Sequence, residues 1–119
     1  ELANFAKTKE VILIASYHNF EKTPDINTLR SIIASGFNAG AEMVKIATFV
    51  NQKNDVKRLQ NLLLAEKRPL CVIGMGDKGT ETRIKFPKMG SKLAYGFIDT
   101  PSAPGQFSVE SLKEILVKF

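Results

Sequence analysis

Hydrophobic and polar positions follow two different periods along this chain. Four short apolar runs, rich in β-branched residues, have the length and composition of buried strands. They lie at Glu10–Ser16, Met43–Phe49, Leu70–Met75 and Leu93–Ile98. Between these runs, apolar residues recur at helical spacing. The pattern therefore predicts strands that alternate with helices.

The ends of the helices are marked by capping residues. Pro24 and Asp25 open the first helix, with Asp25 as its N-cap and Gly40 as its stop. Asn54 or Asp55 is expected to cap the second. The apolar faces of these two helices are Leu29, Ile32, Ile33 and Phe37, and Val56, Leu59, Leu62 and Leu63.

Two further helices complete the pattern. A short helix is expected around Thr80–Lys88, and Ser108 is expected to cap a last one. Four strand–helix units in a single domain, residues 1–119, imply parallel strands and right-handed crossovers. The candidate α/β folds are a doubly wound open sheet and part of a (β/α)8 barrel, and periodicity does not separate them.

The composition is that of an ordinary globular protein, with 44% hydrophobic and 24% charged residues. The net charge of +5 comes from basic residues scattered through helices and loops, which indicates a solvated surface rather than a nucleic-acid face. No apolar run is long enough for a membrane span, and the N-terminus lacks the pattern of a signal peptide. A single cysteine fits a reducing compartment, so we expect a cytoplasmic protein.

Lys45 is the most informative single residue. It lies in the apolar run Met43–Phe49, within a strand expected to be buried on both faces. Burial disfavours the charged ammonium, and a neutral lysine is a nucleophile toward ketones and aldehydes. The alternatives are a buried stem with its ammonium at the surface, and an ion pair with a carboxylate.

His18, the single histidine, comes at the carboxyl end of the first predicted strand. Ligands bind at this edge in parallel α/β folds, and the strand that carries Lys45 is expected to be its neighbour. An imidazole beside a nucleophilic lysine suits imine formation followed by proton abstraction. The alternative is an ordinary surface or hydrogen-bonded histidine.

A glycine pattern between the third strand and its helix, Gly74-Met75-Gly76-Asp77-Lys78-Gly79, matches G-x-G-x-x-G. The dinucleotide fingerprint also needs an acidic residue about 20 positions later, where Asp99 stands. The fingerprint usually opens the first βαβ unit, and here it follows the third strand. A nucleotide-binding domain is thus an alternative of lower weight. One histidine and one cysteine far apart predict no metal site.

The four motifs together resemble one family. Ser16-Tyr17-His18-Asn19-Phe20, Val44-Lys45-Ile46-Ala47, Gly74-Met75-Gly76 followed by Arg83, and Ser102-Ala103-Pro104-Gly105-Gln106 occur in the order and approximate spacing of type I 3-dehydroquinate dehydratases. The resemblance implies a (β/α)8 barrel, of which this chain is the C-terminal half. It also implies a lyase of the shikimate pathway that makes 3-dehydroshikimate from 3-dehydroquinate.

By this resemblance, Lys45 forms an imine with the substrate ketone and His18 transfers protons in a syn elimination of water. Arg83, Ser102 and Gln106 would hold the substrate carboxylate. The pocket would be lined by Met75 and Tyr95, and neither a metal nor an organic cofactor is implied.

Family members are roughly twice as long, and the missing first half contributes an acidic residue that orients the histidine. An incomplete barrel leaves open sheet edges, so we expect association with another copy, as in a homodimer, or with the missing half. A half-barrel that binds substrate or a partner chain without turnover is the alternative to an active enzyme.

Overall fold

The structure is a computed structural model that describes residues 2–8, 11–93, 96–97, 106–108 and 111. Its helices and strands, in chain order, are α1 (Leu2–Thr8), β1 (Ile14–Asn19), α2 (Ile26–Asn38), β2 (Met43–Phe49), α3 (Lys53–Ala65), β3 (Leu70–Met75), the 3₁₀ turn η1 (Asp77–Gly79), α4 (Thr82–Lys88), β4 (Gly96–Phe97) and β5 (Phe107–Ser108). In the described residues, no helix is long and apolar enough to cross a membrane.

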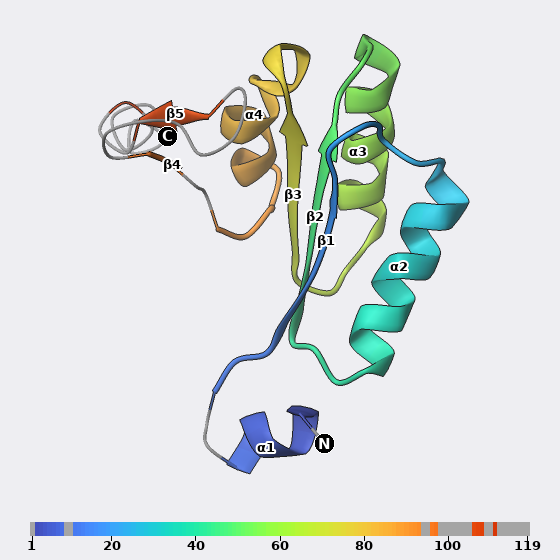
Figure 1. The fold of residues 1–119 in the computed structure, drawn as a ribbon, viewed down its shortest axis with the longest axis vertical. Helices are drawn as coiled ribbons and strands as arrows, with labels where there is room; N and C mark the ends of the chain where they lie inside the picture. The colour runs from blue at the N-terminus through green and yellow to red at the C-terminus, as the bar shows by residue number, and fades with distance from the viewer. Residues whose placement is uncertain (1, 9–10, 94–95, 98–105, 109–110, 112–119) are drawn as a thin grey trace.

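A three-stranded parallel sheet in the order β1-β2-β3 forms the centre of the molecule. Helices α2 and α3 lie side by side along one of its faces, and α4 lies beside β3 (Figure 1). The parallel pairing and the intervening helices agree with the predicted fold class. The bounds of β2 and β3 are those predicted from their apolar runs.

The main core lies between the sheet and helices α2 and α3. It contains the predicted apolar faces of both helices together with the strand residues that point toward them. Leu29, Ile46, Leu59 and Phe86 are fully buried at its centre. At about 25 cal/mol per Å² of apolar surface, this burial is the main force that holds the helices on the sheet.

The predicted ends of α2 are confirmed. Asp25 is its N-cap, and the carboxylate accepts a hydrogen bond of 2.8 Å from the backbone N–H of Thr28. Gly40 follows the helix with a φ of +99°, which an L-residue rarely adopts. A Cβ at Gly40 would also stand 2.4 Å from the Cβ of Ala3, because α1 packs closely there. The sequence pattern did not predict α1.

The predicted N-cap of α3 is wrong. The cap is Gln52, and Asp55 instead lies in the first turn of the helix. Its carboxylate accepts hydrogen bonds from the backbone N–H groups of Asn51, at 2.9 Å, and Gln52, at 3.3 Å. An acidic side chain in the first turn satisfies N–H groups that have no partner within the helix. Asp55 therefore stabilises the start of α3 as expected, but from inside the helix rather than from the N-cap position.

The first strand begins later than predicted and is not buried on both faces. It begins at Ile14, opposite Met43 at the start of β2, and ends at Asn19 rather than Ser16, while Glu10, the predicted start, lies outside the described residues. It lies at the edge of the sheet, and its residues alternate between exposed and half-buried. The alternation is typical of a strand with one covered face.

The fourth predicted strand, Leu93–Ile98, is found only as the short strand β4, which pairs with β5 rather than with β3 in the described residues. The outer edge of β3 already has partners. The backbone N–H of Val72 donates to Ser91 Oγ and that of Gly74 to Thr82 Oγ1, both at 2.8 Å. Leu93 then turns away with a φ of +62°. The division into four units remains a prediction.

Candidate active site

One face of the sheet carries the residues singled out for chemistry. Side chains alternate between the faces of a strand, so residues opposite one another in the register share a face. We call the face turned away from α2 and α3 the site face. Its residues are Ile14, Ser16 and His18 of β1, Met43, Lys45, Ala47 and Phe49 of β2, and Cys71, Ile73 and Met75 of β3.

His18 and Lys45 lie on this face on adjacent strands. His18 pairs in register with Ala47, two residues beyond Lys45, so the two side chains are diagonal neighbours. The pKa of His18 is below its ordinary value of 6.5, first because of burial and second because of the positive charge of Lys45. At neutral pH the imidazole is therefore mainly unprotonated and can accept a proton.

Lys45 is half-buried in the middle of β2 rather than at its end. Its register partners are Ser16 on β1 and Cys71 on β3. Cys71 is fully buried, which raises the pKa of its thiol, while the charge of Lys45 opposes that rise. In the register, the lysine thus stands between the hydroxyl of Ser16 and the thiol of Cys71.

Arg83 approaches the same region from α4. Only 6% of the residue is exposed, and its charge and the Cys71 sulfur influence each other. Burial lowers the pKa of the guanidinium. Its Nε is buried and has no hydrogen-bond partner among the described residues. A buried donor of this kind costs free energy unless a ligand or another group accepts from it.

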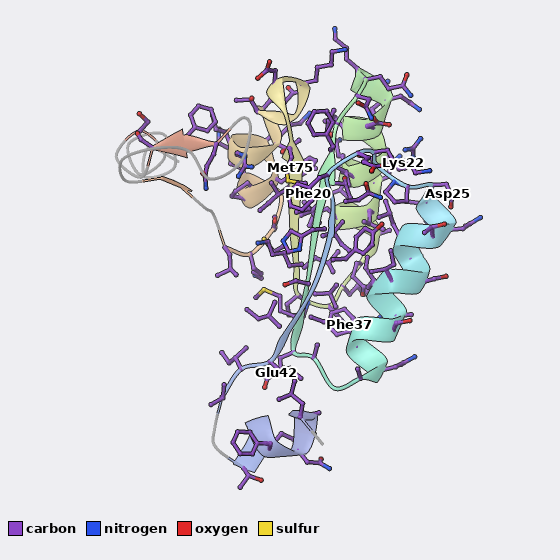
Figure 2. The ribbon with its side chains drawn as sticks, in the orientation of Figure 1. Phe20, Lys22, Asp25, Phe37, Glu42 and Met75 are labelled. Carbon is purple, nitrogen blue, oxygen red and sulfur yellow. The ribbon has the colours of Figure 1, made fainter. Side chains whose placement is uncertain are left out.

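An apolar rim stands above these groups, at the carboxyl ends of the strands. Met75, which the resemblance placed in the pocket, is 3% exposed and pairs in register with Phe49. Figure 2 shows Met75 and Phe20 toward this end of the sheet and Glu42 at the opposite end. Phe49 was not singled out from the sequence. Its position two residues after Ala47 on a strand of period 2 could have identified it.

The glycine pattern after β3 has a packing role. A Cβ at Gly79 would stand 2.5 Å from the carbonyl of Gly74, and one at Gly76 would stand 2.8 Å from the Phe49 ring. Gly76 also has a φ of +89°. The loop is folded onto its own backbone and onto an aromatic ring, so its glycines are accounted for without a bound dinucleotide.

The three remaining predicted site residues come later in the chain, after α4. Tyr95 and Ser102 lie outside the described residues. Gln106 is described as half-buried, just before β5, and is not part of the site face of β1 to β3. Within the described part of the chain, no group of three or more His, Cys, Asp or Glu side chains could hold a metal ion.

Comparison with known proteins identifies relatives over nearly the whole chain. A family model described as "Type I 3-dehydroquinase" matches residues 1–118. The 3-dehydroquinate dehydratase of Methanococcoides burtonii is 41% identical over 93% of this chain and 47% of its own length. That of Methanocella arvoryzae is 39% identical over 96% of this chain and 52% of its own length.

Solved structures agree with these relatives. The 3-dehydroquinate dehydratase of Aquifex aeolicus superposes with a TM-score of 0.91 at 35% identity and covers 99% of this chain and 53% of its own. The type I enzyme of Clostridium difficile, solved with covalently modified comenic acid, superposes with a TM-score of 0.88 at 32% identity. The match covers 98% of this chain and 48% of the other. The chain spans about half the length of the relatives it matches.

Proposed function

Because this chain belongs to the type I 3-dehydroquinase family, we propose that it is the C-terminal half of a 3-dehydroquinate dehydratase barrel and carries its two reacting side chains. The observation that carries the proposal is the placement of His18 and Lys45 as diagonal neighbours on one sheet face. The reaction is the loss of water from 3-dehydroquinate to give 3-dehydroshikimate, within the shikimate pathway.

The first step belongs to Lys45. Its neutral amine adds to the ketone carbon, and loss of water from the adduct leaves an imine. The protonated imine draws electrons from the neighbouring carbon and so acidifies the C–H bond there. The half-buried position of Lys45 in the middle of β2, as a diagonal neighbour of His18, supports this role.

The second step belongs to His18. The neutral imidazole removes the proton from the acidified carbon, and the imidazolium then donates a proton to the departing hydroxyl, which leaves as water. Hydrolysis of the imine consumes the water released in the first step and frees Lys45. The lowered pKa of His18 supports the first of these transfers, because the free base predominates at neutral pH.

Arg83 is the proposed anchor of the substrate carboxylate. Its buried guanidinium has an Nε that donates no hydrogen bond within the described residues. A carboxylate can accept from two guanidinium N–H groups at once, which fixes the orientation of the substrate ring. The same role is proposed for Ser102 and Gln106, and Tyr95 would join Met75 in lining the pocket.

A half-barrel that binds substrate without turnover is the competing proposal. It differs only in the second step, so measuring substrate binding and product formation on the same sample separates the two. The nucleotide-binding alternative has little support, because the glycine pattern is explained by close packing and the family acts on 3-dehydroquinate.

The proposal is tested by mixing the chain with 3-dehydroquinate and borohydride, followed by mass spectrometry and peptide mapping. Borohydride reduces an imine to a stable amine, so we expect one adduct on Lys45. Lys45→Ala should lose it, and Lys57→Ala, at an exposed lysine of α3, should retain it. His18→Ala should retain the adduct and lose dehydration. An adduct on another lysine in the parent chain, or none in a folded sample with its other half added, would contradict the assignment.

A further inference from the structure

We propose that Phe20 is a positioning residue for His18, and that the side chain of Asn19 holds Phe20 in place. The inference rests on the proposed function only for the task that His18 performs. The arrangement itself is a property of the loop between β1 and α2. It gives this half of the barrel its own means of orienting the histidine ring.

The first observation is a ring contact. The rings of His18 and Phe20 are nearly parallel, with an interplanar angle of 8° and centroids 6.0 Å apart. This distance is within the range of offset-stacked aromatic pairs. The stacking limits rotation of the imidazole about its χ2, a torsion that is otherwise broad. It also keeps water from part of the ring.

The second observation is that Phe20 is 66% exposed. A large apolar side chain at this exposure contributes little to the core, so fold stability alone does not account for its position. Figure 2 shows Phe20 toward the carboxyl end of the sheet, where His18 ends the row of site-face residues on β1. The ring therefore stands at the mouth of the proposed site.

The third observation is the fixed turn that carries Phe20. Asn19 Oδ1 accepts hydrogen bonds of 3.0 Å from the backbone N–H groups of both Glu21 and Lys22. The Asn19 Nδ2 donates to the Tyr17 hydroxyl at 3.1 Å, and Tyr17 packs against the main core. This is an Asx turn tied to the core, which sets the backbone on both sides of Phe20.

Asn19 and His18 point to opposite faces of β1, because side chains alternate along a strand. Asn19 is thus anchored on the helix-covered face, while the ring that it places lies against the imidazole. The chain of contacts runs from the core through Tyr17 and Asn19 to Phe20, and from there to His18. Removing any one link should change the surroundings of the histidine without removing the histidine.

The test uses the proton NMR spectrum of the chain, in which His18 is the single histidine and its ring signals are assigned without ambiguity. Phe20→Leu should remove the ring-current contribution to the His18 shifts, and Phe20→Tyr should retain it. Phe20→Ala should move the pKa of His18 upward, toward its ordinary value, because it exposes the ring. Phe5→Leu, at an exposed phenylalanine of α1, is the matched control and should change neither.

The role of Asn19 is tested in the same way. Asn19→Ala should shift the His18 signals as Phe20→Leu does. Asn19→Asp should keep the stacking, because a carboxylate accepts from the same two N–H groups and from the Tyr17 hydroxyl. The amide fingerprint spectrum of each variant reports whether it is folded. His18 shifts that are equal in the parent, Phe20→Leu and Asn19→Ala would overturn the inference.

A chemical measurement separates this inference from the proposed function. With 3-dehydroquinate, Phe20→Leu should form the Lys45 borohydride adduct at the parent rate and make product more slowly, because only proton transfer depends on the ring of His18. An equal loss of both rates would overturn the positioning role. If the folded parent with its other half formed no adduct, the proposed function would fail, and the NMR comparison would still decide the role of Phe20.

Discussion

At the level of single residues, Lys45 shows which part of a site can be read from a sequence. A lysine inside an apolar run indicated a buried amine, and a histidine at the end of the preceding strand indicated its partner. The neighbours of Lys45 in the register, Ser16 and Cys71, could not be predicted, because sequence patterns give the order of strands but not their alignment. Arg83 was recognised from its motif, and its proximity to Cys71 required the structure.

The electrostatic link between His18 and Lys45 leads to a prediction. Lys45→Met removes the charge and keeps much of the side-chain volume, so the pKa of His18 should rise from its lowered value. NMR titration of the single histidine measures this, with Lys57→Met as a control that should leave the pKa unchanged. A His18 pKa identical in the Lys45→Met variant and the parent would contradict the proximity of the two groups.

The same shift has a consequence for stability. The folded state holds the pKa of His18 below 6.5, so it binds protons less readily than the unfolded chain. The free energy of unfolding contributed by this group is therefore present above about pH 6.5 and lost as the pH falls toward the folded pKa. Urea unfolding between pH 7.5 and 5, values chosen roughly to bracket the titration, should show a smaller loss in Lys45→Met than in the parent.

The buried hydroxyl of Thr82 leads to a prediction about stability. Its Oγ1 accepts from the Gly74 N–H at 2.8 Å and donates to the Gly79 carbonyl at 2.7 Å, and the side chain is fully buried. Thr82→Val would leave both backbone groups without this partner and should cost about 1–3 kcal/mol in the free energy of unfolding. Thr82→Ser keeps the hydroxyl and should cost less. Urea midpoints that are equal for the two variants would show that the bonds contribute little.

At the level of elements, burial decided which parts of the fold were predictable. The bounds of β2 and β3 follow from their apolar runs because both strands are largely covered by neighbours. The edge strand β1 ends three residues later than predicted, at Asn19 rather than Ser16, because its limits depend on its pairing with β2. The fourth predicted strand differed for another reason, since in the described residues the side chains of Ser91 and Thr82, rather than a strand, satisfy N–H groups on the outer edge of β3.

Two glycines near α4 distinguish lack of space from backbone strain. Gly79→Ala would place a Cβ 2.5 Å from backbone atoms of Gly74, whereas Gly90→Ala meets nothing within 4 Å but has a φ of +108°. Backbone cannot move aside as a flexible side chain can. Gly79→Ala should therefore reach or exceed the upper end of the roughly 1–3 kcal/mol typical of overpacking, and exceed the strain cost of Gly90→Ala. Thermal unfolding of the two variants compares them, and the reverse order would contradict this account of the loop.

At the level of the whole molecule, the chain has about half the length of its relatives, and no described strand pairs with the β1 edge of its three-stranded sheet. The carbonyl of Leu13 accepts from the N–H of Glu42, so the backbone groups of every second residue from Leu13 face β2. The N–H and C=O groups of the residues between them, including Ser16 and His18, therefore point away from β2. Apolar side chains near this edge are also exposed, among them Val11 at 54% and Ile12 at 65%. We propose that this edge associates with the other half of a barrel or with a second copy.

This association can be measured by light scattering. The chain alone is expected to form a dimer or larger species, or to bind the separately prepared other half. Ile12→Lys should weaken that association, because it places a charge beside the open edge. Leu64→Lys is the matched control, since Leu64 is 60% exposed on α3, which lies on the helix-covered side. A monodisperse monomer with cooperative unfolding, in the presence of the other half, would contradict the proposal.

The hydroxyl groups of Thr82 and Ser91, which accept from backbone N–H groups of β3, also limit what kind of assembly this sheet can build. A filament grows by head-to-tail addition, which requires an adhesive edge at each end of every subunit. Here two amides on the outer edge of β3, those of Val72 and Gly74, donate to those hydroxyls, so among the described residues β1 offers the open edge for strand addition. Two copies joined at β1 would leave no further β1 edge for growth. We therefore expect strand pairing of two copies through β1 to end at a closed pair rather than to propagate into a fibre.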